Sequence, residues 1–151
     1  MKKIVSAEEA GKMIRENCSL MVGGFLRCGT PVKVIEEIIK NKTGNLTLIA
    51  NDTSYPEHDR GRLIANRLVK KAIVGHIGTN PETGRQMNAG ELEVELVPRS
   101  GRHTILFGRI EQVERKFDKL MRFYRSGLQN IGWDAYRTID IRYKDQVVCK
   151  K

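Results

Sequence analysis

The sequence lacks the features that mark secreted, membrane-spanning or disulfide-stabilised proteins. Its three cysteines, Cys18, Cys28 and Cys149, form neither an even disulfide framework nor a CxxC pair, so we expect reduced and mostly buried thiols. No apolar run approaches the roughly 18 residues of a membrane span. The basic start at residues 1–3 runs directly into an acidic pair at residues 8–9, which is unlike a signal peptide. We therefore expect a cytoplasmic chain with no membrane span.

Histidine and aromatic residues are also scarce. Neither His58 nor His76 has a second ligand type at the spacing of a metal site, and neither lies in a nucleophile arrangement. We interpret both as structural or surface residues and predict no metal site. Aromatic residues make up only 6% of the chain, and stacking positions between basic side chains are what a single-stranded nucleic acid would need.

The positive charge is confined to one end of the chain. Residues 1–98 hold 14 Lys+Arg against 12 Asp+Glu, a net of +2, whereas residues 99–151 hold 13 against 6, a net of +7. A basic surface attracts polyanions whatever its purpose, so this charge alone does not indicate nucleic-acid binding. We do not expect a nucleic-acid partner. With 40% hydrophobic and 30% charged residues, the whole 151-residue chain is typical of a globular protein rather than a disordered one.

Helical and strand patterns alternate over the first 98 residues. Ser6 is a good cap for a helix that ends near Asn17, and Thr30 with Pro31 opens a second helix. A third helical stretch covers residues 62–69. Apolar strands are expected at residues 20–22, 46–50, 72–74 and 92–97, with a turn at residues 80–84. Apolar strands separated by helices predict an α/β fold with an open, mostly parallel sheet and helices on both faces.

The pattern changes after Pro98, and we predict a second segment over residues 99–151. A strand at residues 103–107 is followed by a long basic helix with one apolar stripe between residues 110 and 128. A turn at residues 127–133 leads to an alternating strand at residues 136–148. We therefore divide the chain into an N-terminal half, residues 1–98, and a basic strand-helix-strand tail.

A glycine-rich segment between the first strand and the second helix carries the functional signal. It contains Gly23, Gly24 and Phe25, followed by Gly29 and Pro31. Paired glycines let the backbone approach a ligand closely, and a helix N-terminus favours negative groups. A tight strand-to-helix turn that binds no ligand is the alternative reading of these residues alone.

Residues 16–31 resemble the signature of family I acyl-CoA:carboxylate CoA-transferases, with Glu16 standing where the pattern has Asp or Asn. Residues 45–53, 76–86 and 90–96 resemble the α subunits of bacterial acetate, butyrate and acetoacetate CoA-transferases. The resemblance implies a truncated α-subunit fold that takes coenzyme A as a substrate and binds no permanent cofactor. Its substrates would be a short-chain acyl-CoA and a carboxylic acid.

The resemblance also implies how the work is divided between subunits. In this family a glutamate in a Ser-Glu-Asn-Gly motif of the partner β subunit attacks the acyl-CoA, and this chain has no such motif, so no catalytic residue of its own is expected. Glu91 and Glu93 do not replace it, because the α-subunit pattern already has glutamates there. Asn51 is the candidate contributor to an oxyanion hole; an Asx turn with Asp52 is the alternative. The family implies a CoA-binding site at Gly23, Gly24, Phe25, Gly29, Pro31 and Asn51.

The tail resembles a different protein, the C-terminal end of the cell-division protein FtsQ of Bacteroidetes, over residues 95–151. Arg99 stands where the CoA-transferases have a glutamine near the acyl group, and the α-subunit likeness ends there. Two alternatives to a CoA-transferase component therefore stay open. The first is a non-enzymatic interaction module that binds a partner by strand addition, and the second is a fusion without an evolved function.

Overall fold

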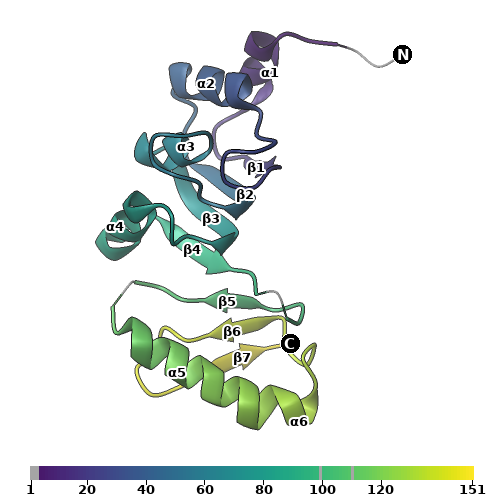
Figure 1. Cartoon of the computed structure of the whole chain (residues 1–151), viewed down its shortest axis with the longest axis vertical. Coiled ribbons are helices and arrows are strands. Elements are labelled where there is room, and N and C mark those ends of the chain that lie inside the picture. Colours follow the sequence, from purple (N-terminus) through teal and green to yellow (C-terminus); the bar gives the residue numbers. More distant parts are fainter. Residues whose placement is uncertain (1–3, 99, 110) are drawn as a thin grey trace.

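The computed structural model describes residues 4–98, 100–109 and 111–151, and its strands form one seven-stranded sheet in the order β1-β2-β3-β4-β5-β6-β7 (Figure 1). The strands are β1 Ser19–Val22, β2 Leu46–Asp52, β3 Val69–His76, β4 Glu93–Leu96, β5 Thr104–Leu106, β6 Thr138–Asp140 and β7 Val148–Lys150. The first four pair in parallel, β4 with β5 and β6 with β7 pair antiparallel, and β5 with β6 pair in parallel. The predicted α/β class and mostly parallel sheet are thus confirmed.

Helices connect the strands as parallel pairing requires. They are α1 Ala7–Met13, α2 Val32–Lys40, α3 Gly61–Ala65, α4 Pro81–Ala89, α5 Val113–Phe123, the π-helix η1 Tyr124–Leu128 and the short α6 Gln129–Ile131. Ser6 caps α1 in a capping box with Glu9, as its sequence predicts. None of the helices in the described ranges is long and apolar enough to cross a membrane.

The two faces of the parallel part of the sheet, β1–β4, differ in burial. Leu48, Ala72 and Val94 lie side by side on one face of neighbouring strands and are at most 4% exposed. On the other face Met21 and Ile49 are register partners, yet Met21 is 77% exposed and Ile49 is only half-buried. The expected covering of both faces does not extend over this patch.

The structure corrects several boundaries. Where a turn was expected at residues 80–84, Asn80 caps α4 through its side chain and Pro81 occupies the first turn. Asn followed by Pro is itself a helix start, and Gly84 is tolerated inside the helix at a cost of about 1 kcal/mol. Helix α1 ends at Met13, before Asn17, and α3 is shorter than the predicted stretch because β3 already begins at Val69.

The tail folds onto the sheet through α5, which lies along β5–β7 (Figure 1). The alternating residues 136–148 form two strands rather than one, since the chain turns between Asp140 and Val148 to pair β6 with β7. Lys116 and Lys119 donate from Nζ to the carbonyl oxygens of Arg109 at 2.6 Å and Ile141 at 3.1 Å. These two charges of the basic helix are therefore structural. The predicted division near Pro98 falls between β4 and β5, two paired strands, and stays a prediction.

Candidate functional site

The glycine-rich segment forms a closed loop between β1 and α2. The backbones of Phe25 and Cys28 bond to each other in both directions, with N···O distances of 3.0 and 2.9 Å. Gly24 has φ +98°, and a Cβ there would stand 2.5 Å from the carbonyl oxygen of Cys28. Gly29 also has positive φ, at +74°. The loop can take this form because glycine has no Cβ penalty at positive φ. The same loop exposes Cys28, contrary to the buried thiol that was expected.

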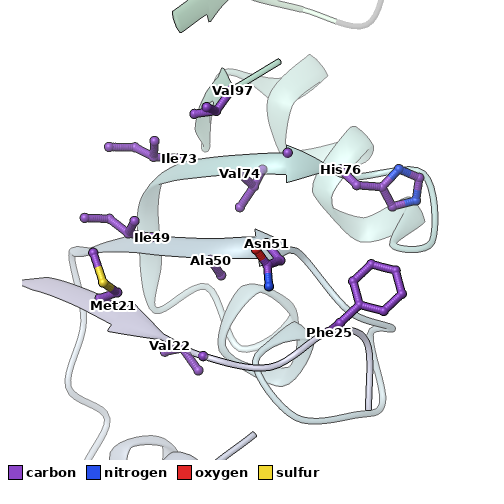
Figure 2. Close-up of a pocket in the computed structure, with 12 residues that line it drawn as sticks. Met21, Val22, Phe25, Ile49, Ala50, Asn51, Ile73, Val74, His76 and Val97 are labelled. Carbon is purple, nitrogen blue, oxygen red and sulfur yellow. The ribbon is translucent and has the colours of Figure 1, made fainter. Parts of the chain in front are cut away.

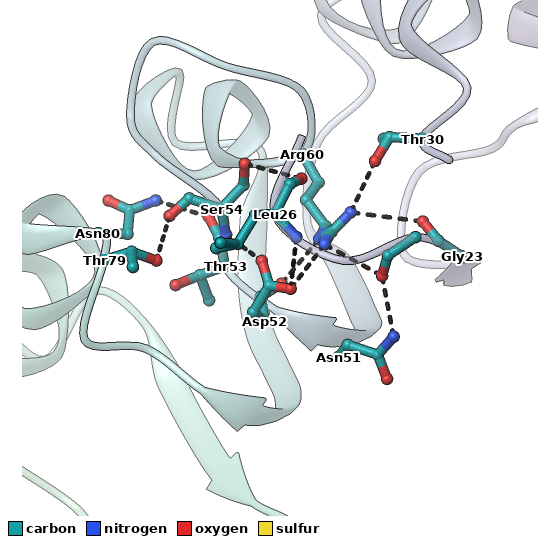
Figure 3. A network of polar contacts seen from close by, with 11 residues as sticks. Gly23, Leu26, Thr30, Asn51, Asp52, Thr53, Ser54, Arg60, Thr79 and Asn80 are labelled. Atoms are coloured by element: carbon teal, nitrogen blue, oxygen red, sulfur yellow. Dashed lines mark hydrogen bonds and ion pairs between the residues drawn. The ribbon is translucent and has the colours of Figure 1, made fainter. Parts of the chain in front are cut away.

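Arg60 holds this loop from within the protein (Figure 3). Its side chain is fully buried, yet its guanidinium donates to the carbonyl oxygens of Gly23 and Gly24, both at 3.3 Å, and to Oγ1 of Thr30 at 2.9 Å. The hydroxyl of Thr30 is thus used by Arg60, and α2 begins after Pro31 without the side-chain cap expected from Thr30. A buried cation needs a partner, which β2 supplies.

The partner is Asp52, at the end of β2. Its Oδ2 lies 2.8 Å from Arg60 Nη2 and 3.0 Å from the backbone nitrogen of Leu26, while Oδ1 accepts from Ser54 N at 2.7 Å. Burial pushes the pKa of Asp52 upward, but the N–H groups of Leu26 and Ser54 and the guanidinium of Arg60 together hold that pKa below its usual value. The carboxylate is therefore ionised, and it ties the loop to the sheet.

Asn51, the residue before Asp52, faces the loop as well. Its Nδ2 donates to the carbonyl oxygen of Gly24 at 2.9 Å (Figure 3). The Asx turn considered for this pair is made by Asp52, which accepts from the backbone two residues on, at Ser54. The amide of Asn51 is thus fixed against the glycine loop. Its Nδ2 carries two N–H groups, and one of them is used in the bond to Gly24, which leaves the other for a ligand.

An open hollow of about 800 Å³ lies beside this loop (Figure 2). Its lining is Met21, Val22, Gly23, Phe25, Ile49, Ala50, Asn51, Ile73, Val74, Gly75, His76 and Val97. Phe25 and Asn51 lie at one end with His76, and Met21, Ile49 and Ile73 lie at the other. Of the predicted site residues, Gly23, Phe25 and Asn51 therefore line the hollow, whereas Gly24, Gly29 and Pro31 belong to the adjoining loop and are not among the lining residues.

The hollow suits an uncharged, partly apolar portion of a ligand. No Lys, Arg, Asp or Glu is among its lining residues, and its polar side chains are the amide of Asn51 and the imidazole of His76. Phe25 is 58% exposed at its rim. The lining has no carboxylate, thiol or hydroxyl, so its side chains include no nucleophile of the usual carboxylate or serine type. The described residues contain no group of three side chains able to hold a metal ion.

Sequence reasoning missed Arg60 and did not recognise the role of Asp52. Periodicity reports apolar faces, and an arginine whose partners are backbone carbonyls and a carboxylate eight residues away leaves no periodic signal. The nearest signal is Gly61, where a Cβ would stand 1.9 Å from the carbonyl oxygen of Tyr55. A glycine required at that point indicates that the neighbouring segment is packed tightly.

Comparison with known protein families divides the chain into two overlapping parts. Residues 4–108 match the model of the coenzyme A transferase family, and residues 83–150 match the model described as FtsQ/DivIB, C-terminal related. The overlap, residues 83–108, covers most of α4 and all of β4 and β5. Both resemblances seen in the sequence are thereby confirmed.

Among curated proteins, the chain is 46% identical over 96 residues to the acetoacetyl-CoA:acetate/butyrate CoA transferase alpha subunit of Clostridium acetobutylicum. It is equally similar to the acetate CoA-transferase subunit alpha of Escherichia coli. Each match covers 64% of this chain and 44% of the relative, so the chain spans less than half of the length of these proteins.

A solved structure has the same fold over part of its length. The acyl-CoA transferase YdiF of E. coli O157:H7, in a thioester complex with CoA, superposes with a TM-score of 0.52 at 22% identity. The match covers 62% of this chain and 20% of that one. At this identity the likeness concerns the fold alone.

Proposed function

We propose, from the premise that this chain belongs to the coenzyme A transferase family through residues 4–108, that it acts as an α-subunit-like component of a CoA-transferase. Its substrates would be a short-chain acyl-CoA and a carboxylic acid, between which CoA is moved. Coenzyme A is then a substrate and not a resident cofactor. The curated relatives of C. acetobutylicum and E. coli, which carry CoA-transferase activity in their names, support this assignment.

The nucleophile would come from a partner β subunit. A glutamate carboxylate attacks the acyl carbonyl and releases the CoA thiolate, leaving a mixed anhydride. The thiolate attacks the glutamyl carbonyl of that anhydride and releases the carboxylate of the first acid, and the glutamyl-CoA thioester then passes CoA to the second acid by the reverse steps. The open hollow without a carboxylate of its own supports this division, because it can be completed from outside.

In this scheme Asn51 would stabilise the negative charge that develops on the carbonyl oxygen. Its amide is held by Gly24 at the rim of the hollow, beside Phe25. The free N–H of its Nδ2 can donate to the oxygen that becomes negative when the carbonyl is attacked. One such donor is worth roughly 3–4 kcal/mol in the transition state. Phe25 offers an apolar surface to the chain of the ligand.

The observation that carries the proposal is the juxtaposition of the glycine loop, Asn51 and an apolar hollow at one end of β2. To test it, the chain is purified together with a β subunit of a related two-subunit enzyme, and exchange of CoA between acetyl-CoA and butyrate is followed by chromatography. Asn51→Ala should lower the exchange rate by roughly 100-fold, whereas a substitution at exposed Glu57 should leave it unchanged. Failure of the wild-type chain to form a complex and to bind CoA would refute the proposal.

A second candidate function rests on the tail. The match to the FtsQ/DivIB C-terminal-related model includes β7, which ends the strand order and has one unpaired edge. Such an edge can accept a strand of another protein. Capture of a cell-division protein by the wild-type chain, lost when Val148→Pro removes a backbone donor from β7, would favour this role over CoA transfer.

A further inference from the structure

One peptide of the glycine loop is held firmly at its carbonyl end. The carbonyl oxygen of Gly23 accepts from Arg60 Nη1 at 3.3 Å. The next carbonyl, of Gly24, accepts from Arg60 Nη2 at 3.3 Å and from Asn51 Nδ2 at 2.9 Å. Two adjacent carbonyls are thus turned toward the interior by a single guanidinium.

The amide groups of these peptides must point the other way. A trans peptide is planar, with its C=O and N–H directed oppositely. The N–H of Phe25 finds a partner in the carbonyl oxygen of Cys28 at 3.0 Å, but the N–H of Gly24 forms no hydrogen bond within the described chain. This N–H points away from Arg60 and belongs to the peptide that begins at Gly23. Gly23 lines the hollow, and a Cβ built on it would meet no heavy atom within 4 Å.

The arrangement is rigid on the Arg60 side. The guanidinium is planar, with its donors fixed in a fork, and its Nε and Nη2 are bonded to the carbonyl oxygen and Oδ2 of Asp52, both at 2.8 Å. Arg60 and Asp52 are both fully buried. Because the fork cannot turn, the peptide between Gly23 and Gly24 cannot flip without leaving a buried donor unpaired.

We infer that Arg60 is a positioning residue of the site, which fixes the Gly23–Gly24 peptide so that the N–H of Gly24 donates to the carbonyl oxygen of a bound acyl-CoA thioester. This inference rests on the proposed function, since it takes the thioester as the ligand of the hollow. The Gly24 N–H and the Asn51 amide would then form a two-donor set, one from the backbone and one from a side chain. The N–H of Gly24 would reach the ligand from the peptide that it shares with the lining residue Gly23, and Arg60 acts through this peptide.

The inference is tested by nuclear magnetic resonance on the ¹⁵N-labelled chain during addition of acetyl-CoA. The Gly24 amide proton should move downfield as it gains a hydrogen bond, while the amide of Gly90, at the end of α4, should not move. Binding of acetyl-CoA with an unmoved Gly24 amide overturns this inference and leaves the proposed function standing. No binding of acetyl-CoA, either to the chain alone or to its complex with a β subunit, overturns both.

Variants separate positioning from folding. Arg60→Met removes the fork, and Arg62→Met, two residues further on, is the matched control because the Arg62 guanidinium pairs with Glu36, at 3.4 Å, and not with the glycine loop. In complex with a β subunit, Arg60→Met should lower kcat by roughly 100-fold with KM little changed, as expected for loss of a transition-state donor. If Arg60→Met does not fold, Thr30→Val serves as the second variant. It keeps the Arg60–Asp52 pair and removes one acceptor of the guanidinium, so kcat should fall by less than in Arg60→Met. Unchanged kcat in a folded Arg60→Met or in Thr30→Val would overturn the inference.

Discussion

The two ends of the sheet are built on different principles. In the N-terminal part, β2 and β3 span seven and eight residues, and a fully buried ion pair joins Asp52 at the end of β2 to Arg60 before α3 and shapes a loop. In the tail, β5, β6 and β7 have three residues each, and long cationic side chains of α5 bind backbone carbonyls. Long parallel strands can place polar groups at one shared end, where a site forms, whereas short strands depend on their helix for stability. The comparison separates a part built around a site from a part built around a helix.

The largest effect is expected from breaking the buried pair of the N-terminal part. Asp52→Ala leaves the guanidinium of Arg60 buried without its anion, which should lower the free energy of unfolding by about 3–5 kcal/mol. Urea denaturation followed by circular dichroism measures this change. Glu57→Ala, an exposed change nearby, should stay within about 0.5 kcal/mol of wild type. Equal losses for the two variants would show that the pair does not stabilise this part.

The tail should respond most to loss of apolar packing beneath its helix. Leu128 is fully buried in η1, and Leu128→Ala should cost about 3 kcal/mol through lost contacts and a cavity. Trp133, the single tryptophan, lies in the tail, so its fluorescence reports that part directly. If the continuous sheet makes the chain one cooperative unit, fluorescence and circular dichroism transitions coincide. Two separate transitions would show that the ends unfold independently.

A change of pH is the mildest of these perturbations and should act on the tail. Burial lowers the pKa of His103 below 6.5, against opposing effects of the Trp133 carbonyl and of Asp134, and its Nε2 lies 2.7 Å from the Tyr124 hydroxyl. The folded chain therefore binds a proton less readily than the unfolded chain. The free energy of unfolding should therefore keep its full value above about pH 6.5 and decrease as pH falls through the lowered pKa of His103.

Urea titrations at several pH values between about 7.5 and 5 measure this loss. His103→Gln removes the titrating group, so the stability of that variant should fall less over this range than the stability of wild type. Parallel curves for the two chains would contradict the assignment to His103.

Much of the fold could be predicted from the sequence, because its strands are short apolar runs between recognisable helix signals. The predicted strands at residues 46–50 and 72–74 lie within β2 and β3, and the one at residues 92–97 exceeds β4 by one residue at each end. Helix α4 was missed because Asn80 and Pro81 were interpreted as a turn, although the same residues suit a cap and a first turn. The alternation at residues 136–148 concealed a turn, since exposed polar residues of a turn can continue the period of a strand.

The candidate site was only partly predictable. The glycine loop and Asn51 are carried by local sequence, and the structure brings Phe25 and Asn51 to one hollow. The role of Arg60 depends on contacts with residues about 30–37 positions earlier in the chain, at Thr30 and Gly23. No local pattern encodes such distant hydrogen bonds, and an arginine is ordinarily an exposed residue.

The strict sequential order of the strands has a consequence for how such a chain can arise and be synthesised. Every strand pairs with the one made just before it, so each addition extends a finished edge and requires no rearrangement of earlier strands. During translation the sheet can grow from its first edge as the nascent chain leaves the ribosome, with few long loops to close. In evolution the same order makes the edge of β4 a natural grafting point, where a foreign hairpin and helix can be appended to an existing sheet without disturbing its interior.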